Sequence, residues 1–489
     1  MAFKIGDAPI VATKPAVRLI AVNGRVRQPR AGGIRQRRCY RARSIRHGGA
    51  PLNPTPTASA GADLAAFERA TYAKVTWRLL PFLLLCYVVA YLDRVNVGFA
   101  KLQMSADLGF SDAVYGLGAG IFFIGYFLFE VPSNLVMHKV GARLWIARIM
   151  LTWGCVSAAT AFVTTPAMFY AARFALGAAE AGFFPGVLLY LTYWFPAQRR
   201  GGMTALFMTA VPLTGVLGGP LSGWILQACS GFEGLAGWQW LFVVQAAPSI
   251  LAAVATLVFL DEGIAGARWL SPAEKALLRR HIDAEQSAKP AHSLRDVFVS
   301  PSVWRMSAIY FCFVMGLYGI GFWLPTLIRA TGVTQPLEIG WLTAIPYGVA
   351  GLVMLAVSAS SDRRLERRWH VAIPAALGGL GLLLSTLFAH NTTLAMAAMT
   401  LATAGIVTAL PLFWSLPTAL LGGAAAAAGL AMINSIGNLA GFVSPYLVGV
   451  ISGATHDTRI GMAILAVSMF IGAALTLSAK PDTEQPERA

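Results

Sequence analysis

The sequence is poor in charged side chains. Asp, Glu, Lys and Arg make up 12% of its 489 residues, whereas soluble domains contain about 25%. Hydrophobic residues account for 56%. This balance excludes an ordinary soluble domain and predicts a protein that crosses the membrane many times.

Motifs of soluble enzymes are also missing. The sequence contains no Ser-His-Asp arrangement, HExxH, phosphate-binding loop or zinc spacing, so we expect no catalytic residues, no metal site and no cofactor. The cysteines have neither metal-ligand spacing nor the pattern of a disulfide framework, and most lie in apolar runs: Cys39, Cys86, Cys155, Cys229 and Cys312. They are expected to be small buried side chains.

The first 60 residues almost lack acids. Asp7 is their only acid, beside ten arginines and two lysines, and no apolar period runs through them, so we expect a disordered tail. Because this tail carries most of the net charge of +16, that charge does not indicate nucleic-acid binding. The segment fits a basic tail on anionic lipid, a transit peptide, or sequence translated from a wrongly chosen start. We favour the last interpretation.

What the sequence has in abundance is long apolar runs. They predict an all-α membrane protein with about twelve transmembrane helices in two six-helix halves, a transporter architecture whose site lies between the halves. The expected spans are residues 77–98, 113–136, 144–164, 167–192, 203–228, 239–260, 304–328, 337–359, 370–390, 393–416, 424–452 and 459–479. The expected domains are a tail (1–70), an N-terminal half (71–260), a linker (261–301), a C-terminal half (302–480) and a C-terminal tail (481–489).

Basic residues are concentrated in alternate loops, which sets the expected orientation. One side has Lys139, Arg143, Arg148, Arg199, Arg200, Arg363, Arg364, Arg367 and Arg368, and the other has little more than Lys101, Arg329 and Arg459. We therefore expect a multi-pass protein of the cell (inner) membrane with both termini in the cytoplasm. The linker contains a capping box at Ser271–Glu274 that predicts a short cytoplasmic helix.

Two predicted spans each carry both an acid and a base, and charges are costly at membrane depth and persist where they face protein or water. The first span contains Asp93 and Arg94, and the fourth contains Arg173 and Glu180 on one helix face, about 10 Å apart along the axis. These residues fit a membrane edge in the first span or a structural charge network. They also fit an anion site with protonatable carboxylates, and a network and a site are compatible with each other.

Other polar and aromatic residues have two interpretations each. Tyr310, Tyr318 and Trp323 in the seventh span, and Trp414 in the tenth, suit either an interfacial belt or a cavity lining beside a proline. Asn434 and Asn438 lie one turn apart and suit either helix–helix hydrogen bonds or contact with a ligand. The glycine-proline run Gly215–Gly223 favours close helix packing.

Several motifs together resemble the anion:cation symporter family of the major facilitator superfamily, which includes tartrate, phthalate and hexonate/hexarate transporters. The resemblance covers about residues 67–480. It is carried by Tyr91-Leu-Asp-Arg-Val-Asn-Val-Gly-Phe-Ala100, Val131-Pro-Ser-Asn134, Arg173 to Gly186, Tyr193-Trp-Phe-Pro196, Gly237-Trp-Gln-Trp240, Phe322-Trp-Leu-Pro325, Ala431-Met-Ile-Asn-Ser-Ile-Gly-Asn438 and Pro445-Tyr446.

The resemblance implies roles for particular residues. Asp93 and Glu180 match protonatable carboxylates, Arg94 matches a substrate-facing arginine, and Arg173 matches the arginine that pairs with the glutamate. Cavity-lining positions are implied for Tyr91, Tyr126 and Asn434. With Asn438, Trp323 and Trp414 added from the residue patterns, these form the predicted substrate site.

The resulting expectation is a secondary active transporter. It would import a small organic anion (a sugar acid, dicarboxylate or aromatic carboxylate) with protons by alternating access, as a monomer in the lipid bilayer with the proton gradient as energy source. The alternatives are a proton/drug antiporter, against which the buried arginines argue, and a transporter-like nutrient receptor. Measured flux into liposomes would separate a receptor from a carrier.

The unusual composition of the tail predicts that residues 1–60 are dispensable. A variant without them is expected to insert into membranes and take up substrate as the full chain does, because the predicted spans and charged residues all follow the tail. Membrane fractionation and uptake assays check this, and loss of both properties in the shortened chain would contradict it.

Overall fold

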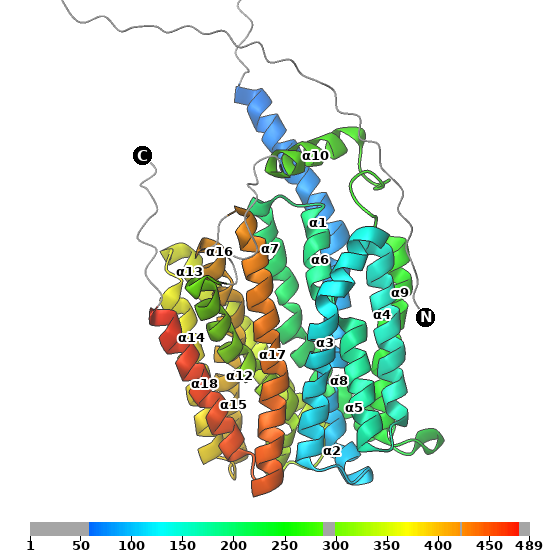
Figure 1. Ribbon diagram of the computed structural model, residues 1–489, viewed down its shortest axis with the longest axis vertical. Helices are drawn as coiled ribbons and strands as arrows, with labels where there is room; N and C mark the ends of the chain where they lie inside the picture. Colours follow the sequence, from blue (N-terminus) through cyan, green and yellow to red (C-terminus); the bar gives the residue numbers. More distant parts are fainter. Residues whose placement is uncertain (1–57, 287–298, 421–422, 479–489) are drawn as a thin grey trace, which may run out of the picture. The chain divides into compact units, whose positions relative to one another are not determined.

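The computed structural model describes residues 58–286, 299–420 and 423–478, and within these ranges the ordered structure is entirely helical (Figure 1). Its α-helices are α1 (Ala58–Val95), α2 (Val97–Asp107), α3 (Asp112–Val140), α4 (Ala142–Ala159), α5 (Pro166–Glu180), α6 (Phe183–Thr192), α7 (Ala197–Met208), α8 (Ala210–Ala228), α9 (Gly237–Phe259), α10 (Pro272–Gln286), α12 (Pro301–Ala330), α13 (Pro336–Arg364), α14 (Arg368–Leu387), α15 (Thr392–Phe413), α16 (Ser415–Leu420), α17 (Gly423–Thr455) and α18 (Arg459–Ser478). The tail at 1–57 and the C-terminal tail lie outside the described residues.

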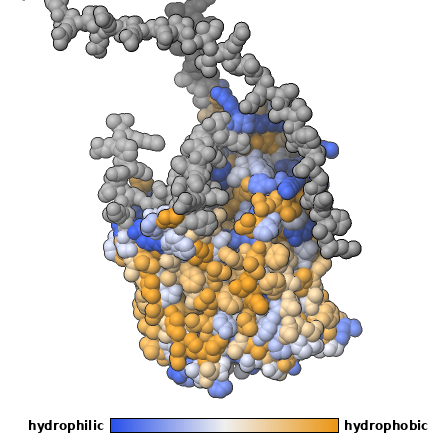
Figure 2. Space-filling view, viewed as in Figure 1, coloured by the Kyte–Doolittle hydropathy of each residue, from blue (hydrophilic) through white to orange (hydrophobic). Residues whose placement is uncertain are grey.

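Twelve segments of the described chain are long and apolar enough to cross a membrane, which confirms the expected fold class. Figure 2 shows a broad hydrophobic surface over these helices and hydrophilic residues gathered at the end that carries α10. Helices α3, α4, α5 and α9 pack together, as do α14, α15 and α18, and α17 lies beside α3 where the two groups meet (Figure 1).

The first helix begins at Ala58 rather than near Trp77, where the first span was expected. Hydropathy detects lipid contact, whereas the part of α1 just before the apolar run makes polar contacts. Lys74 Nζ donates to Glu274 of α10 at 3.0 Å, and the Tyr72 hydroxyl lies 3.0 Å from His281 Nδ1. The first helix therefore extends beyond the apolar bundle and binds α10.

The predicted capping box is present at the start of α10. Ser271 Oγ accepts from the amide of Glu274 at 3.2 Å, and the Glu274 carboxylate accepts from the amide of Ser271 at 2.7 Å. That backbone hydrogen bond holds the pKa of the Glu274 carboxyl below its usual value. The linker helix is thus fixed at its N-terminus by its own sequence.

Within the described chain, four predicted spans are each divided into two α-helices: residues 77–98, 167–192, 203–228 and 393–416. Residues 167–192 form α5 and α6, separated at Gly182, whose φ of 89° lies in the left-handed region that glycine adopts freely. A Cβ at Gly182 would lie 2.7 Å from Cβ of Ser133 on α3. The close approach of α3 fixes this break, which leaves Glu180 at the last position of α5.

At the end opposite α10, the two groups of helices meet through glycines. Gly219 of α8 faces Gly340 of α13, and Gly116 of α3 faces Gly449 of α17. The glycine-proline run of the fifth span is therefore a packing surface, as expected. Beside it, buried Lys101 of α2 forms an ion pair with Asp112 at 2.8 Å, and Asp112 also accepts from Ser452 of α17. These contacts close the far end of the bundle.

The glycine contact between α8 and α13 predicts that Gly340→Val opens this end. An added Cβ would lie 2.9 Å from the carbonyl carbon of Gly219, and overpacking of this kind costs about 1–3 kcal/mol. In a cysteine-free background, a cysteine at buried Thr343 should react with an impermeant maleimide about tenfold faster. Gly348→Val is the matched control, because its Cβ meets only a Val216 side-chain atom at 3.8 Å. Equal labelling of both variants would contradict the prediction.

Candidate functional site

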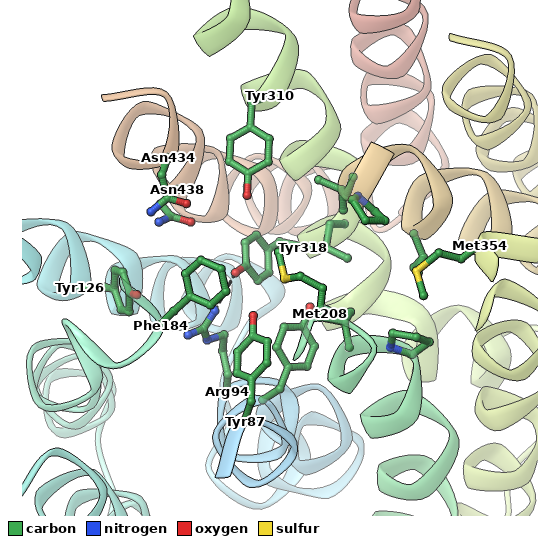
Figure 3. A pocket seen from close by; sticks show the side chains of 17 residues that line it. Tyr87, Arg94, Tyr126, Phe184, Met208, Tyr310, Tyr318, Met354, Asn434 and Asn438 are labelled. Carbon is green, nitrogen blue, oxygen red and sulfur yellow. Dashed lines mark hydrogen bonds between the residues drawn. The ribbon is translucent and has the colours of Figure 1, made fainter. Parts of the chain in front are cut away.

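A cavity lies between the two groups of helices. It encloses about 670 Å³ of empty space, part of it open to solvent. Figure 3 shows its lining side chains converging from several helices. The lining consists of Tyr87, Tyr91, Arg94, Tyr126, Phe184, Met208, Val211, Pro212, Tyr310, Leu317, Tyr318, Met354, Val407, Leu410, Pro411, Asn434 and Asn438.

Arg94 is the charged member of this lining. Its Nη1 donates to the Tyr318 hydroxyl of α12 at 2.9 Å, and its Nη2 forms an ion pair with Glu180. The guanidinium carbon lies 5.4–5.7 Å from the ring centres of Tyr91, Phe122 and Tyr126. Within the described residues its Nε has no hydrogen-bond partner. Arg94 is therefore held in place through Nη1 and Nη2, with its Nε–H still unused.

The predicted pairing of Arg173 with Glu180 is wrong, because Glu180 pairs with Arg94. Arg173 is fully buried, and its Nε donates to the carbonyl of Gly118 at 3.3 Å while its Nη2 donates to that of Arg94 at 3.5 Å. Arg173 and Glu180 share one face of α5, but they are seven residues apart, which separates them by about 10 Å along the helix axis. Arg94, on a neighbouring helix, lies at the level of Glu180. Arg173 lies outside the cavity lining and holds the backbones of α3 and α1.

Asp93 also lies outside the cavity. It is 1% exposed and accepts from Ser249 Oγ at 2.5 Å, Ser157 Oγ at 3.0 Å and Trp153 Nε1 at 3.1 Å. Consecutive residues of a helix point about 100° apart, so α1 directs Arg94 into the cavity and Asp93 between α4 and α9. The two charges are neighbours in sequence and belong to different environments.

A third buried carboxylate was missed by the sequence interpretation. Glu130 of α3 is 5% exposed and accepts from Asn434 Nδ2 at 3.0 Å and Ser435 Oγ at 3.5 Å, both on α17. It therefore joins the two groups of helices beside the cavity. The available signal was an acid inside an apolar predicted span.

The remaining predicted site residues divide into two sets. Tyr91, Tyr126, Asn434 and Asn438 line the cavity. The two tryptophans do not. Trp323 is fully buried, with Lys101 Nζ 4.2 Å from its ring centre.

Trp414 packs against Tyr310, with ring centres 4.8 Å apart, and so supports the lining from behind. Four aromatic residues of the lining were absent from the predicted site: Tyr87, Phe184, Tyr310 and Tyr318. Their rings were recognisable in the sequence, but their orientation depends on helix rotation. Within the described part of the chain, no cluster of three or more His, Cys, Asp or Glu residues is placed to hold a metal.

The buried Arg94–Glu180 pair predicts a strong dependence of stability on both partners. Removing one member of a buried pair costs about 3–5 kcal/mol, because the other charge is left uncompensated. Arg94→Ala should therefore lower the thermal unfolding midpoint of the purified protein, and the double variant Arg94→Ala/Glu180→Gln should recover part of the loss. Additive losses in the double variant would show that the two side chains do not stabilise each other.

Comparisons with known proteins agree with the arrangement of membrane-spanning helices described above. The family model "Major Facilitator Superfamily" matches residues 83–445. Similar sequences include a protein of Pseudomonas putida described as the metabolite transport protein NicT, 48% identical over 85% of this chain and 96% of that protein. Others are a protein of Agrobacterium vitis described as a tartrate transporter (47%, covering 84% and 94%) and a quinolone resistance transporter of Acinetobacter baumannii (41%, covering 84% and 95%).

Among solved structures, the xylose transporter XylE from E. coli superposes with a TM-score of 0.68 at 14% identity, over 84% of this chain and 99% of that one. This likeness shows the fold alone. The family model covers most of the twelve spans, and the sequence relatives are matched over nearly their whole length. The chain therefore belongs to the Major Facilitator Superfamily of membrane transporters.

Proposed function

We propose that this transporter imports a small organic anion together with protons by alternating access. The observation that carries the proposal is Arg94, a guanidinium that lines the cavity between the two groups of helices with its Nε unpartnered. A cation at membrane depth is costly unless it meets an opposite charge. Glu180 supplies that charge in this structure, and a substrate carboxylate that takes its place suits the planar geometry of an arginine side chain.

Charge balance supports coupling to protons. Five charged side chains are buried at and around the cavity: Asp93, Glu130, Glu180, Arg94 and Arg173. Carboxylates already outnumber guanidinium groups in this set. An entering anion would add negative charge to a medium that solvates it poorly, and protonation of a carboxylate offsets that cost. Uptake of the anion and uptake of protons are thereby linked.

Glu180 is the proposed link between anion uptake and proton uptake. It binds the same guanidinium that a substrate carboxylate would bind. When substrate takes its place, Glu180 loses its counter-ion in a fully buried position, which favours its protonated form. Asp93 is the second proposed proton-carrying group, held apart from the cavity by Ser157, Ser249 and Trp153.

The rest of the lining suits a ring or a polyol. Tyr87, Tyr126, Phe184, Tyr310 and Tyr318 supply aromatic faces, which pack equally well on a sugar or benzoate ring. Asn434 and Asn438 supply amides for hydroxyl or carboxylate groups. Sugar acids, dicarboxylates and aromatic carboxylates are therefore the proposed substrate class, a choice that the tartrate-transporter relative supports.

We also propose that the transporter works as a monomer in the inner membrane with the α10 end in the cytoplasm. The helix ends on that side carry Lys139, Arg143, Arg199, Arg363 and Arg364, and basic residues that flank spans remain on the cytoplasmic side.

A second candidate function is drug export in exchange for protons. The quinolone resistance relative favours it, and quinolones carry a carboxylate that Arg94 could bind. Export and import differ in the direction of substrate flow relative to the proton gradient, so one assay separates them.

The test uses the full chain reconstituted in liposomes. A panel of sugar acids, tartrate, benzoates and a quinolone is offered under an imposed inward proton gradient. We expect at least one carboxylate to accumulate, and dissipation of the gradient to stop the accumulation. Failure of every carboxylate, or accumulation indifferent to the proton gradient, would refute the proposal. Loss of preloaded quinolone driven by inward protons would support the second candidate.

Glu180→Gln is the matched variant for coupling, since glutamine imitates the protonated carboxyl in size and shape. It is expected to exchange labelled for unlabelled substrate across the membrane and to lose gradient-driven accumulation. Full accumulation by this variant would show that Glu180 is a structural counter-ion only.

A further inference from the structure

A second cavity lies next to the first, toward the end opposite α10. Each of α1, α8, α12 and α13 lines the first cavity nearer the α10 end and the second cavity farther from it, and Tyr91 lines both. The second lining is polar at Asn96, Thr214, Ser222 and Thr343 and contains no Asp, Glu, Lys or Arg. A largely apolar, uncharged lining with these few polar groups suits water rather than a carboxylate.

Asn96 also indicates that the second cavity suits water. It occupies the break between α1 and α2, is 1% exposed, and neither its Oδ1 nor its Nδ2 has a hydrogen-bond partner in the part of the chain that the structure describes. A buried amide left without partners costs about 1–3 kcal/mol for each unsatisfied group. Water both donates and accepts, so it satisfies the two atoms of Asn96 at once.

From this cavity a line of polar side chains leads to Asp93. Ser222 of α8 lines the cavity, and its Oγ accepts from Gln245 Nε2 of α9 at 2.8 Å. Gln245 is 2% exposed, and its Oε1 has no partner. One turn farther along α9, Ser249 donates to the Asp93 carboxylate at 2.5 Å. Residues four apart on a helix are about 6 Å apart, a gap that one water molecule bridges.

The substrate cavity offers no comparable route. Among the described residues, the side chains that donate hydrogen bonds to Asp93 are Trp153, Ser157 and Ser249, which lie on α4 and α9 and do not line that cavity. Asp93 interacts electrostatically with Arg173 and Glu180 of α5, and Arg94 follows it in α1. Arg94 and Glu180 are bound to each other.

We propose that protons reach Asp93 from the second cavity along Ser222, Gln245 and Ser249, separately from the substrate. The step conserves protons. The cavity water gives a proton to the water held by Gln245 Oε1, this water gives one to Ser249 Oγ, and Ser249 gives its own to Asp93, while the cavity water is reprotonated from the far side. Gln245 is thus a positioning residue that carries no proton itself. The inference rests on the proposed proton coupling.

The test uses the full chain in liposomes with a carboxylate found to accumulate. Gln245→Met keeps the side-chain volume and removes the amide. It is expected to slow proton-driven uptake about tenfold or more, because a positioned proton transfer is lost, while substrate exchange at equal pH stays at the wild-type rate. Gln245→Glu retains an acceptor oxygen and should restore most of the driven rate. Ser222→Ala should reproduce the Gln245→Met defect more mildly.

Thr256→Val is the matched control, since Thr256 is a fully buried hydroxyl of α9 that donates within its own helix to Ala252. Wild-type driven uptake by Gln245→Met, or equal loss of exchange and driven uptake, would overturn the route. So would a defect of the same size in Thr256→Val. Absence of proton-driven uptake in the wild-type chain would instead bring down the proposed function, and the route with it.

Discussion

The burial of charge within an apolar bundle is the constraint on which this structure depends. Arg94 and Glu180 come from α1 and α5, and each is tolerated because the other neutralises it. The tyrosine rings around the guanidinium and the hydroxyl of Tyr318 complete its environment. The Arg94–Glu180 ion pair holds α1 against α5. A substrate anion that binds Arg94 would therefore have to replace the Glu180 carboxylate.

The sequence predicted the fold well because hydropathy records lipid contact directly. The resemblance to the symporter family implied Arg94, Tyr91, Tyr126 and Asn434 as cavity residues, and the residue pattern added Asn438. The resemblance gave Glu180 the wrong partner, because the rotation and height of α1 relative to α5 are set by packing. Glu130 was missed although its residue type carried the necessary signal, and the tryptophans misled because large rings are equally common in linings and in packed cores.

The geometry separates two tasks that the sequence places side by side. Consecutive residues of α1 direct Arg94 to the substrate cavity and Asp93 to the serines of α4 and α9. A single helix can then bring an anion site and a proton site into the same movement without letting the ligands meet. Tyr91 lines both cavities and therefore lies at the boundary between them.

The contact between α10 and the extended first helix has a practical consequence. Lys74 and Tyr72 bind α10 on the polar extension of the helix that also carries Arg94. An antibody fragment that binds the surface of α10 would therefore also restrain α1, the helix that places the Arg94 guanidinium in the cavity. Such a fragment offers both a fiducial for imaging a protein with few polar features and a means of arresting its cycle from one face of the membrane.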